Sequence, residues 1–314
     1  MDLKKIVSHW FPLDRVAKIE PLGRNAVWRV VLSDFRNFYL KCVTNIDEKS
    51  ILWEKDLLVC LRETGFTVDL PLFLPCINGK WLYTDSSDAS FYMMSEVPGK
   101  EITRGKEIGI LLAEYHNHAR YITMPKRKPG FTYCLLRSLL PAGWDWKDLI
   151  GAYADMPVDC TKKANKLIGR CKELDNLPGE SYLLPVHGDW MACNLCESPY
   201  GILDFECAEW DDVCVDVAKM LDNAYSSSKC VYDAAMACTL LDGYFSTTTL
   251  PLSVYKRLDS FIQRRILGGF VYEASHVFLS ADVAADKAVF WAERQYAQYE
   301  AAVGLMPHIA GCLV

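Results

Sequence analysis

Short apolar runs separated by turn-forming residues fill the first third of the chain, a pattern typical of antiparallel strands. Strands are predicted at residues 16–20, 27–32, 38–43, 81–84 and 90–94, after a short helix at 6–11. Between the third and fourth strands, apolar residues at helical spacing predict a helix over 47–64, which Gly65 ends. The N-terminal part is therefore predicted to be an antiparallel sheet with one main helix.

The pattern changes at Pro98-Gly99, a turn-forming pair after which helical spacing of the apolar residues dominates. Helices are predicted at residues 105–122, 160–174, 213–224, 230–244, 252–278 and 281–304, and short strands at 182–186 and 200–203. We place the domain boundary at this turn, so that a lobe of residues 1–96 precedes a larger, mainly helical lobe of residues 97–314. The predicted fold class is α+β.

Composition narrows the class of protein. The chain has 314 residues, of which 51% are hydrophobic, enough to fill one large or two coupled folded units. Its 34 basic and 40 acidic residues argue against a broad nucleic-acid-binding surface and permit a cationic small substrate. No apolar run approaches the roughly 18 residues that span a bilayer, and the cysteines are scattered through apolar segments. We expect reduced thiols and a cytoplasmic protein that binds neither nucleic acid nor membrane; the sequence does not predict its oligomeric state.

Lys41 lies in the predicted strand 38–43, on the same face as Tyr39 and Val43. A lysine among apolar neighbours is either an edge residue whose ammonium reaches solvent or a buried cation that needs an anion. Glu54 falls in the apolar stripe of the following helix, and a carboxylate that points inward needs a partner. Two interpretations stay open: Glu54 pairs with Lys41, or it flanks the stripe and is solvated.

The strongest functional pattern follows the predicted strands 182–186 and 200–203. The first strand leads into His187-Gly188-Asp189, with Asn194 five residues after Asp189, and the second leads into Asp204-Phe205-Glu206. Phosphoryl transfer needs metal ligands with carboxylate or amide oxygens, and a carboxylate that orients the attacking hydroxyl. The spacing between these residues matches the kinase pattern H-R-D-x-x-x-x-N followed by D-F-G.

With these residues the chain resembles the aminoglycoside phosphotransferase and choline kinase-like family, small-molecule kinases with a protein-kinase-like fold. The resemblance implies two lobes with the nucleotide, ATP or GTP, in the cleft between them. It implies that Asp189 orients or deprotonates the hydroxyl of a small-molecule acceptor, and that Asn194 and Asp204 bind Mg²⁺. Lys41 is expected to hold the α- and β-phosphates, with Glu54 fixing its position.

The same resemblance assigns two further nucleotide-binding segments. Residues 22–30 are similar to the loop that covers the nucleotide; this loop includes Gly23 and Asn25, and Gly23 is its only glycine. The adenine-binding hinge is similar to the stretch formed by Met94, Ser95, Glu96 and Val97.

Three residues near the motif are interpreted as structural. His187 is read as a packed histidine, because the neighbouring carboxylate of Asp189 already serves as the acid or base. His116 is interpreted as a core histidine with its hydrogen bonds satisfied. By the family resemblance, Asp216 is expected to brace the catalytic loop from the following helix.

The acceptor is the least determined part of the sequence interpretation. Glu206, Glu209 and Asp211, with Asp212, form an acidic run that fits a docking edge for a polycationic acceptor such as an aminoglycoside. A solvated loop, with Asp212 as a helix cap, explains the same run. Aromatic residues in the C-terminal helices fit either a cage for a choline-like cation or the protein core.

The sequence thus predicts a Mg²⁺-dependent enzyme that transfers the γ-phosphate of ATP or GTP to a hydroxyl of a small molecule. An aminoglycoside-like or other antibiotic is the first candidate acceptor, and choline, homoserine or a sugar is the alternative. Two hypotheses from other classes stay open. One is a metal-dependent phosphohydrolase with His187, Asp189 and Asp204 as ligands; the other is a nucleotide-binding regulator without catalysis.

Overall fold

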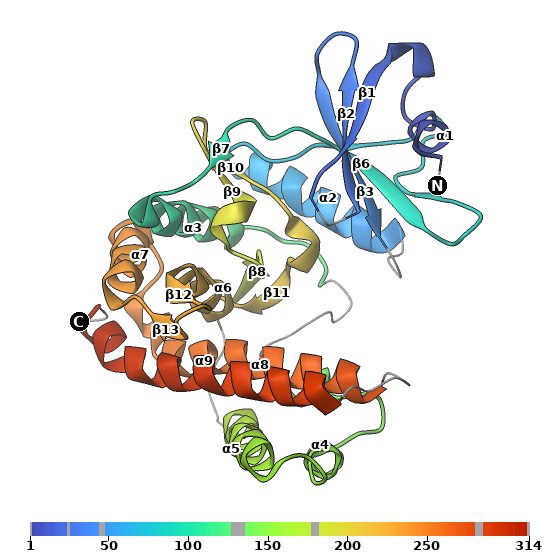
Figure 1. Cartoon of the computed structure of the whole chain (residues 1–314). Helices are drawn as coiled ribbons and strands as arrows, with labels where there is room; N and C mark the ends of the chain where they lie inside the picture. The colour runs from blue at the N-terminus through green and yellow to red at the C-terminus, as the bar shows by residue number, and fades with distance from the viewer. Residues whose placement is uncertain are drawn as a thin grey trace. The chain divides into compact units, whose positions relative to one another are not determined.

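A computed structural model describes residues 2–23, 26–43, 48–126, 136–176, 182–279 and 285–312 (Figure 1). The chain divides into two compact units. The first consists of Met1–Ile102, Ile122–Arg127 and Cys193–Glu206, and the second of Thr103–Tyr121, Lys128–Ala192 and Cys207–Val314. Asn194 and Asp204 therefore belong to the first unit, whereas Asp189 belongs to the second.

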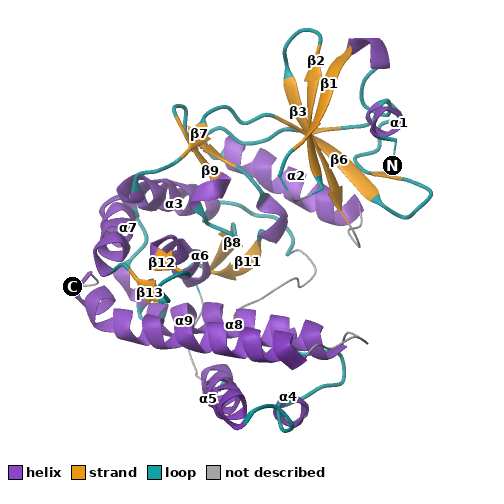
Figure 2. Ribbon diagram, viewed as in Figure 1, coloured by secondary structure: helices purple, strands orange, loops and turns teal. Residues whose placement is uncertain are grey.

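An antiparallel sheet forms the centre of the first unit. Its strand order is β1-β2-β3-β6-β4, and β5 also pairs with β6. Figure 2 labels β1, β2, β3 and β6 of this sheet. The strands are β1 (Val16–Pro21), β2 (Val27–Leu32), β3 (Asn37–Val43), β4 (Phe73–Leu74), β5 (Tyr83–Thr84) and β6 (Ser90–Ser95). Lys41 lies in the middle of this sheet, opposite Val27 of β2 on one side and Tyr92 of β6 on the other.

One hydrophobic cluster joins this sheet to the first residues of the chain. Ile6 and Val7 of α1 (Leu3–Val7) are buried together with Trp10, Phe11 and inward-facing residues of β2, β3 and β6. The 3₁₀ helix η1 (Leu13–Arg15) then leads into β1. In α2 (Glu48–Glu63) the buried positions follow a helical stripe that includes Glu54, which is 2% exposed. This burial excludes the interpretation in which Glu54 flanks the stripe and is solvated.

A smaller antiparallel sheet brings a distant segment into the first unit. In this sheet β9 (Leu195–Glu197) pairs with β7 (Lys100–Glu101) on one side and with β10 (Gly201–Ile202) on the other. The main-chain N–H of Ile102 also donates to the carbonyl of Leu195, 3.1 Å away. These hydrogen bonds attach residues 193–206 to a unit otherwise built largely from the first hundred residues.

The second unit is mainly helical (Figure 1). Its α-helices are α3 (Gly105–Ala119), α4 (Trp146–Ala152), α5 (Val158–Asp175), α6 (Cys214–Met220), α7 (Ala234–Thr247), α8 (Leu258–Leu279) and α9 (Ala285–Cys312). Two antiparallel pairs accompany them, β8 (Leu183–Val186) with β11 (Glu209–Asp212) and β12 (Tyr225–Ser226) with β13 (Val231–Tyr232). The remaining 3₁₀ helices are η2 (Leu136–Leu139), η3 (Ala192–Asn194), η4 (Phe205–Cys207), η5 (Leu221–Ala224) and η6 (Leu252–Tyr255).

Two glycines allow α3 and α7 to pack backbone against backbone. A Cβ atom on Gly109 would lie 2.0 Å from the carbonyl oxygen of Leu240, and one on Gly243 would lie 2.1 Å from that of Lys106. Real Cβ contacts are never that short, so both positions require glycine. This close packing fixes α3, the helix that carries the buried residues Tyr115 and His116.

The antiparallel sheet and the helical second unit confirm the predicted α+β class. The prediction of helix for residues 230–233 is wrong, because Val231–Tyr232 is strand β13 and α7 begins only after Asp233, whose carboxylate accepts the N–H of Met236. The strands β7, β9 and β11 were not predicted. Within the described residues, no helix is both long and apolar enough to cross a membrane.

Candidate active site

The hairpin of β9 and β10 places Asn194 and Asp204 at the same end of two adjacent strands. Leu195 pairs with Ile202, and one residue further the N–H of Leu203 donates to the carbonyl of Asn194, 2.8 Å away. Asp204 follows directly with φ of 60°, a left-handed conformation that aspartate tolerates better than most residues. The two predicted metal ligands thus leave the hairpin side by side in the first unit.

The ammonium group of Lys41 lies against the predicted metal-binding carboxylate. Its Nζ is 2.7 Å from Oδ1 of Asp204 and 2.6 Å from Oε2 of Glu206. The Lys41 side chain is 14% exposed, so these charges interact in a partly desolvated setting where pairing is stronger than in water. Burial acts to lower the pKa of Lys41, but the charges of Asp204 and Glu206 raise it above the ordinary value of 10.5. Lys41 is therefore a buried cation with anionic partners, not an edge residue.

Glu54 lies in the buried stripe of α2, as the periodicity predicts. Lys41 has two anionic partners outside α2, the carboxylates of Asp204 and Glu206. Sequence reasoning missed the contact with Glu206, which follows the predicted metal ligand by two residues. The pairing of Glu54 with Lys41 stays a prediction.

The predicted hinge follows β6 and is held by neighbouring strands. Met94 pairs with both Tyr39 and Phe73, and the N–H of Ser95 donates to Leu72 O at 2.8 Å. Glu96 accepts hydrogen bonds from Tyr39 Oη at 3.1 Å and from Asn37 Nδ2 at 2.9 Å. Burial, and then the charge of Glu96, raise the pKa of Tyr39 to about 12, so Tyr39 remains a donor at neutral pH.

These contacts occupy the Glu96 carboxylate and fix the backbone that leads to Val97, whose side chain is buried. In the predicted nucleotide loop, Gly23 has a φ of 63°, a turn conformation suited to glycine. Asn25 lies outside the described residues.

In the second unit, β8 carries the chain into the predicted catalytic loop, which begins at His187, through a glycine that admits no side chain. Gly188 has φ of 79°, and a Cβ atom there would lie 2.3 Å from the carbonyl oxygen of Cys207. The turn at Gly188 directs Asp189 out of the strand, with its side chain 33% exposed. Glycine is thus required between the buried His187 and the partly exposed Asp189 carboxylate.

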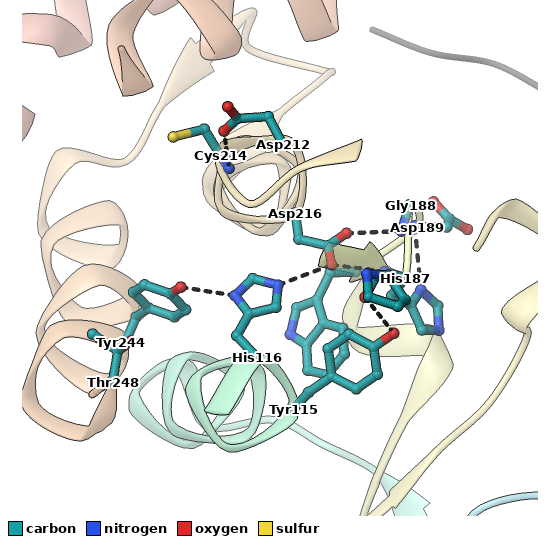
Figure 3. A network of polar contacts seen from close by, with 12 residues as sticks. Tyr115, His116, His187, Gly188, Asp189, Asp212, Cys214, Asp216, Tyr244 and Thr248 are labelled. Atoms are coloured by element: carbon teal, nitrogen blue, oxygen red, sulfur yellow. Dashed lines mark hydrogen bonds and ion pairs between the residues drawn. The ribbon is translucent and has the colours of Figure 1, made fainter. Parts of the chain in front are cut away.

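Asp216 of α6 binds the backbone of this turn (Figure 3). Its Oδ2 accepts the N–H of His187 and its Oδ1 accepts the N–H of Gly188, both at 2.7 Å. The carboxylate is fully buried, and hydrogen bonds from two backbone N–H groups compensate for its burial. This is the geometry that bracing of the catalytic loop requires.

The same carboxylate connects the loop to α3 and α7. His116 Nε2 lies 3.1 Å from Asp216 Oδ2, and His116 Nδ1 lies 2.7 Å from the hydroxyl of Tyr244. Burial raises the pKa of Tyr244 well above its ordinary value, so this phenol stays protonated. The interpretation of His116 as a core histidine with satisfied hydrogen bonds is confirmed.

His187 is fully buried and packs edge-on against Trp190, with ring centroids 5.4 Å apart. Its Nδ1 accepts the N–H of Asp189 at 3.2 Å, which holds the loop in a tight turn. Asn223 secures the following residues, because its Oδ1 accepts the N–H of Ala192 at 2.8 Å and its Nδ2 donates to Trp190 O at 3.1 Å. Asn223 was not predicted from the sequence, although asparagine side chains commonly form hydrogen bonds with backbone groups.

Lys219 of α6 contacts the predicted catalytic carboxylate. Its Nζ lies 3.0 Å from Oδ1 of Asp189 and 3.6 Å from Oδ2 of Asp222. Sequence reasoning did not identify this contact, because Lys219 lies thirty positions after Asp189 and no motif or spacing connects the two. The charge next to Asp189 is therefore positive.

The acidic run is a strand and not a loop. Glu209 and Asp211 lie in β11, which pairs with β8, and their exposed fractions are only 8% and 1%. The interpretation of this run as a solvated loop is therefore wrong, whereas its role as a docking edge for the acceptor stays a prediction. Glu206, with a side chain 39% exposed, is paired with Lys41. Asp212 accepts the N–H of Cys214 at 2.9 Å at the start of α6, as expected of a helix cap.

The oxygen donors of the first unit suit Mg²⁺. This ion prefers carboxylate and amide oxygens, and is usually held by one or two carboxylates together with substrate phosphates and water. Asn194 and Asp204 supply an amide and a carboxylate at one hairpin end, and the ammonium of Lys41 lies against Asp204. The chemistry of these residues therefore fits a magnesium nucleotide.

Comparison with known proteins identifies the family. The sequence profile of the phosphotransferase enzyme family matches residues 18–248. None of the curated protein sequences matches the chain.

Among solved structures, the fold is similar to that of a microcompartment-associated aminopropanol kinase, with a TM-score of 0.66, 19% identity, and coverage of 96% of this chain and 97% of that chain. It is also similar to an amicoumacin kinase in complex with AMP-PNP, Ca²⁺ and Ami, with a TM-score of 0.63, 16% identity, and coverage of 95% and 92%. An aminoglycoside phosphotransferase from Alicyclobacillus acidocaldarius has a TM-score of 0.62 at 15% identity, with coverage of 97% and 95%.

At these identities the structural likeness establishes the fold, and the profile establishes the family. The profile match covers both the lysine strand and the two aspartate motifs. The chain therefore belongs to the phosphotransferase enzyme family and is a small-molecule kinase with a protein-kinase-like fold.

Proposed function

We propose that this enzyme transfers the γ-phosphoryl group of ATP or GTP, as its Mg²⁺ complex, to a hydroxyl of a small molecule. The observation that carries the proposal is the contact of Lys41 with Asp204 and Glu206, across 163 positions of sequence in the case of Asp204. A kinase needs a phosphate-binding cation beside its metal-binding carboxylate. A phosphohydrolase built on His187, Asp189 and Asp204 gives this lysine no task.

The residues of the first unit would bind the nucleotide. Asn194 and Asp204 would hold Mg²⁺, which when bound supplies positive charge to the phosphates. Lys41 exchanges its carboxylate partners for the α- and β-phosphates, and Glu54 keeps its ammonium in place. The backbone after β6 receives the adenine or guanine. Because the Ser95 N–H donates to Leu72, we assign the base contact to the backbone around Val97.

Asp189 would face the acceptor. In the second unit it is a partly exposed carboxylate at the end of a turn that Gly188 and Asp216 hold in place. A carboxylate in that position accepts the hydrogen bond of the acceptor hydroxyl, orients the oxygen for attack and takes its proton as the phosphoryl group transfers. His187 has no part in proton transfer, because it is buried and its Nδ1 accepts the N–H of Asp189.

Two acceptor classes fit the proposal. Relatives of this fold are described as kinases of aminopropanol and of amicoumacin, and as aminoglycoside and spectinomycin phosphotransferases. An amino alcohol or a hydroxylated antibiotic is therefore the acceptor to test first. Glu209 and Asp211 are buried, and their part in binding a polycationic acceptor is tested separately below.

Asp189→Asn tests the proposal. We expect phosphoryl transfer to fall by at least about 10³-fold, while the nucleotide dissociation constant changes by less than about two-fold, because the substitution removes a proton acceptor but leaves the first unit intact. ATP and GTP consumption would be followed with a panel of amino alcohols, aminoglycosides, macrolides, homoserine and sugars. Asp242→Asn, at an exposed ion pair with Lys106, is the matched control.

Retained transfer in Asp189→Asn would contradict the role given to Asp189. Metal-dependent release of phosphate from simple esters, unaffected by Lys41→Met, would favour the phosphohydrolase instead.

A further inference from the structure

A second carboxylate lies close to the ammonium that contacts Asp189. Lys219 Nζ lies 3.0 Å from Asp189 and 3.6 Å from Asp222, and the Lys219 side chain is 11% exposed. Lys219 lies in α6, one turn after Asp216, so the same helix binds both the backbone and the side chain of the catalytic loop. The lysine therefore separates two negative charges that would otherwise face each other.

Asp222 is itself fixed from three elements. Arg265 of α8 lies 3.1 Å from its Oδ2, and the Tyr232 hydroxyl of β13 lies 3.3 Å from its Oδ1. Gln298 of α9 donates to the same Oδ1 at 3.4 Å. Burial raises the pKa of Tyr232 far above its ordinary value, so the phenol remains a donor. Lys219 is thus held between a rigid carboxylate and the catalytic one.

Three side chains around the turn at Asp189 and Asp222 make different contacts. His187 Nδ1 accepts the backbone N–H of Asp189. Arg265 is paired with Asp222. Lys219 places its ammonium in direct contact with the Asp189 carboxylate.

We propose that Lys219 is a positioning residue for phosphoryl transfer, which orients the Asp189 carboxylate and offsets the negative charge of Asp222 beside it. The inference rests on the proposed function in one respect, the role of Asp189 toward the acceptor hydroxyl. An ammonium contact makes a carboxylate a weaker base, but a loose phosphoryl-transfer transition state needs orientation of the nucleophile more than a strong base. Lys219 thus orients the Asp189 carboxylate and at the same time makes it a weaker base.

Lys219→Met should separate this role from a structural one. We expect kcat at pH 7 to fall about 10- to 100-fold, with the KM for nucleotide changed by less than about two-fold, because the lost interaction orients one catalytic atom. Without the ammonium, Asp222 disfavours ionised Asp189, so the acidic limb of the pH profile should move up by about one pH unit. Lys219→Arg should restore most of the rate, and Lys106→Met, which breaks an exposed ion pair, should match the wild type.

The double variant Lys219→Met with Asp222→Asn provides a further test. Removal of the second carboxylate should return the acidic limb toward its wild-type position, whereas a merely structural lysine predicts additional damage. An unmoved acidic limb in Lys219→Met, or equal losses in kcat and in nucleotide binding, would overturn the proposal.

A titration without substrate separates this inference from the proposed function. The carboxyl ¹³C resonance of Asp189, assigned by its absence in Asp189→Asn, should titrate about one pH unit higher in Lys219→Met than in the wild type. If that shift is observed but no acceptor is phosphorylated, the electrostatic link stands and the proposed function fails. If transfer is observed and the resonance does not shift, the proposal for Lys219 fails alone.

Discussion

His116 Nε2 lies 3.1 Å from Oδ2 of Asp216, inside a unit where both side chains are fully buried. The same Asp216 accepts the backbone N–H groups of His187 and Gly188. His116 is therefore connected to the turn before Asp189 through one carboxylate. The hydroxyl of Tyr244 continues the chain on the other side of the imidazole. The position of Asp189 is thus set by a hydrogen-bonded network that links α3, α6 and α7.

Asp216→Asn should destabilise the protein by roughly 2–4 kcal/mol, because an amide has one acceptor oxygen where the carboxylate has two, and a buried N–H would then face an NH₂ group. Denaturant midpoints would measure the loss. Asp242→Asn, at an exposed carboxylate, should change stability by less than about 0.5 kcal/mol. A loss in Asp216→Asn as small as that of the control would show that the buried contacts are not needed.

Gly188→Ala should cost roughly 2–4 kcal/mol and most of the activity. The new methyl would meet the Cys207 carbonyl at 2.3 Å, and the backbone conformation at φ of 79° is itself unfavourable for alanine. Gly169→Ala is the matched control. Gly169 lies inside α5 with nothing within 4 Å of an added Cβ, so alanine should stabilise the helix by about 0.5–1 kcal/mol. Thermal unfolding of both variants would check the opposite signs, and equal melting temperatures would contradict the steric argument.

The sequence predicted well the elements whose pattern is local. Residues 27–32 form β2 at the predicted bounds, and Glu54 is buried because its position in a helical stripe fixes its direction. The Asp189, Asn194 and Asp204 motif was readable for the same reason: its members lie at fixed spacings at strand ends.

The features that were not predicted from the sequence depend on contacts between residues far apart in the chain. β11 has the sequence Glu209-Trp210-Asp211-Asp212, whose acidic residues have low strand propensity, so its strand state depends on pairing with β8. Lys219 approaches Asp189 because of how α6 packs, which no periodicity reveals. Asp233, by contrast, was a usable signal: an aspartate before Ala234 is a typical N-cap and marks the true start of α7.

Lys41→Met should weaken nucleotide binding by about 10- to 100-fold, because it removes a charged phosphate contact from a partly buried site. It should also leave Asp204 and Glu206 facing each other without a cation, and lower the free energy of unfolding by roughly 1–3 kcal/mol at pH 7. Isothermal titration with ATP and GTP, and denaturant midpoints, would measure the two effects. Lys18→Met, at an exposed ion pair with Glu20 in β1, should change neither.

The pH dependence of that stability difference follows from the raised pKa of Lys41. Burial opposes the charge, but the two carboxylates outweigh it and hold the pKa above 10.5. A group whose folded-state pKa is raised stabilises the fold fully below its unfolded pKa, and the stabilisation disappears as pH rises through the folded value. The difference between wild type and Lys41→Met should therefore be constant from pH 6 to about 9 and shrink above about pH 10.5. A difference that shrinks already between pH 7 and 9 would contradict the ion pairs.

The last prediction concerns the buried acidic strand β11. It distinguishes an effect of substitution on stability from an effect on acceptor binding. Asp211 is 1% exposed and its Oδ1 accepts the N–H of Asp212 at 2.7 Å, so Asp211→Asn should lower stability by roughly 1–3 kcal/mol. If the acceptor does not reach this carboxylate, the KM values of cationic and neutral acceptors should change by the same factor. Glu206→Gln is the comparison within the same acidic run, because its side chain is 39% exposed and pairs with Lys41, so it should alter nucleotide binding while stability changes less. A KM that rises at least about ten-fold for cationic acceptors alone in Asp211→Asn, with unchanged melting, would mean that β11 opens to the acceptor and that an acidic docking edge forms after all.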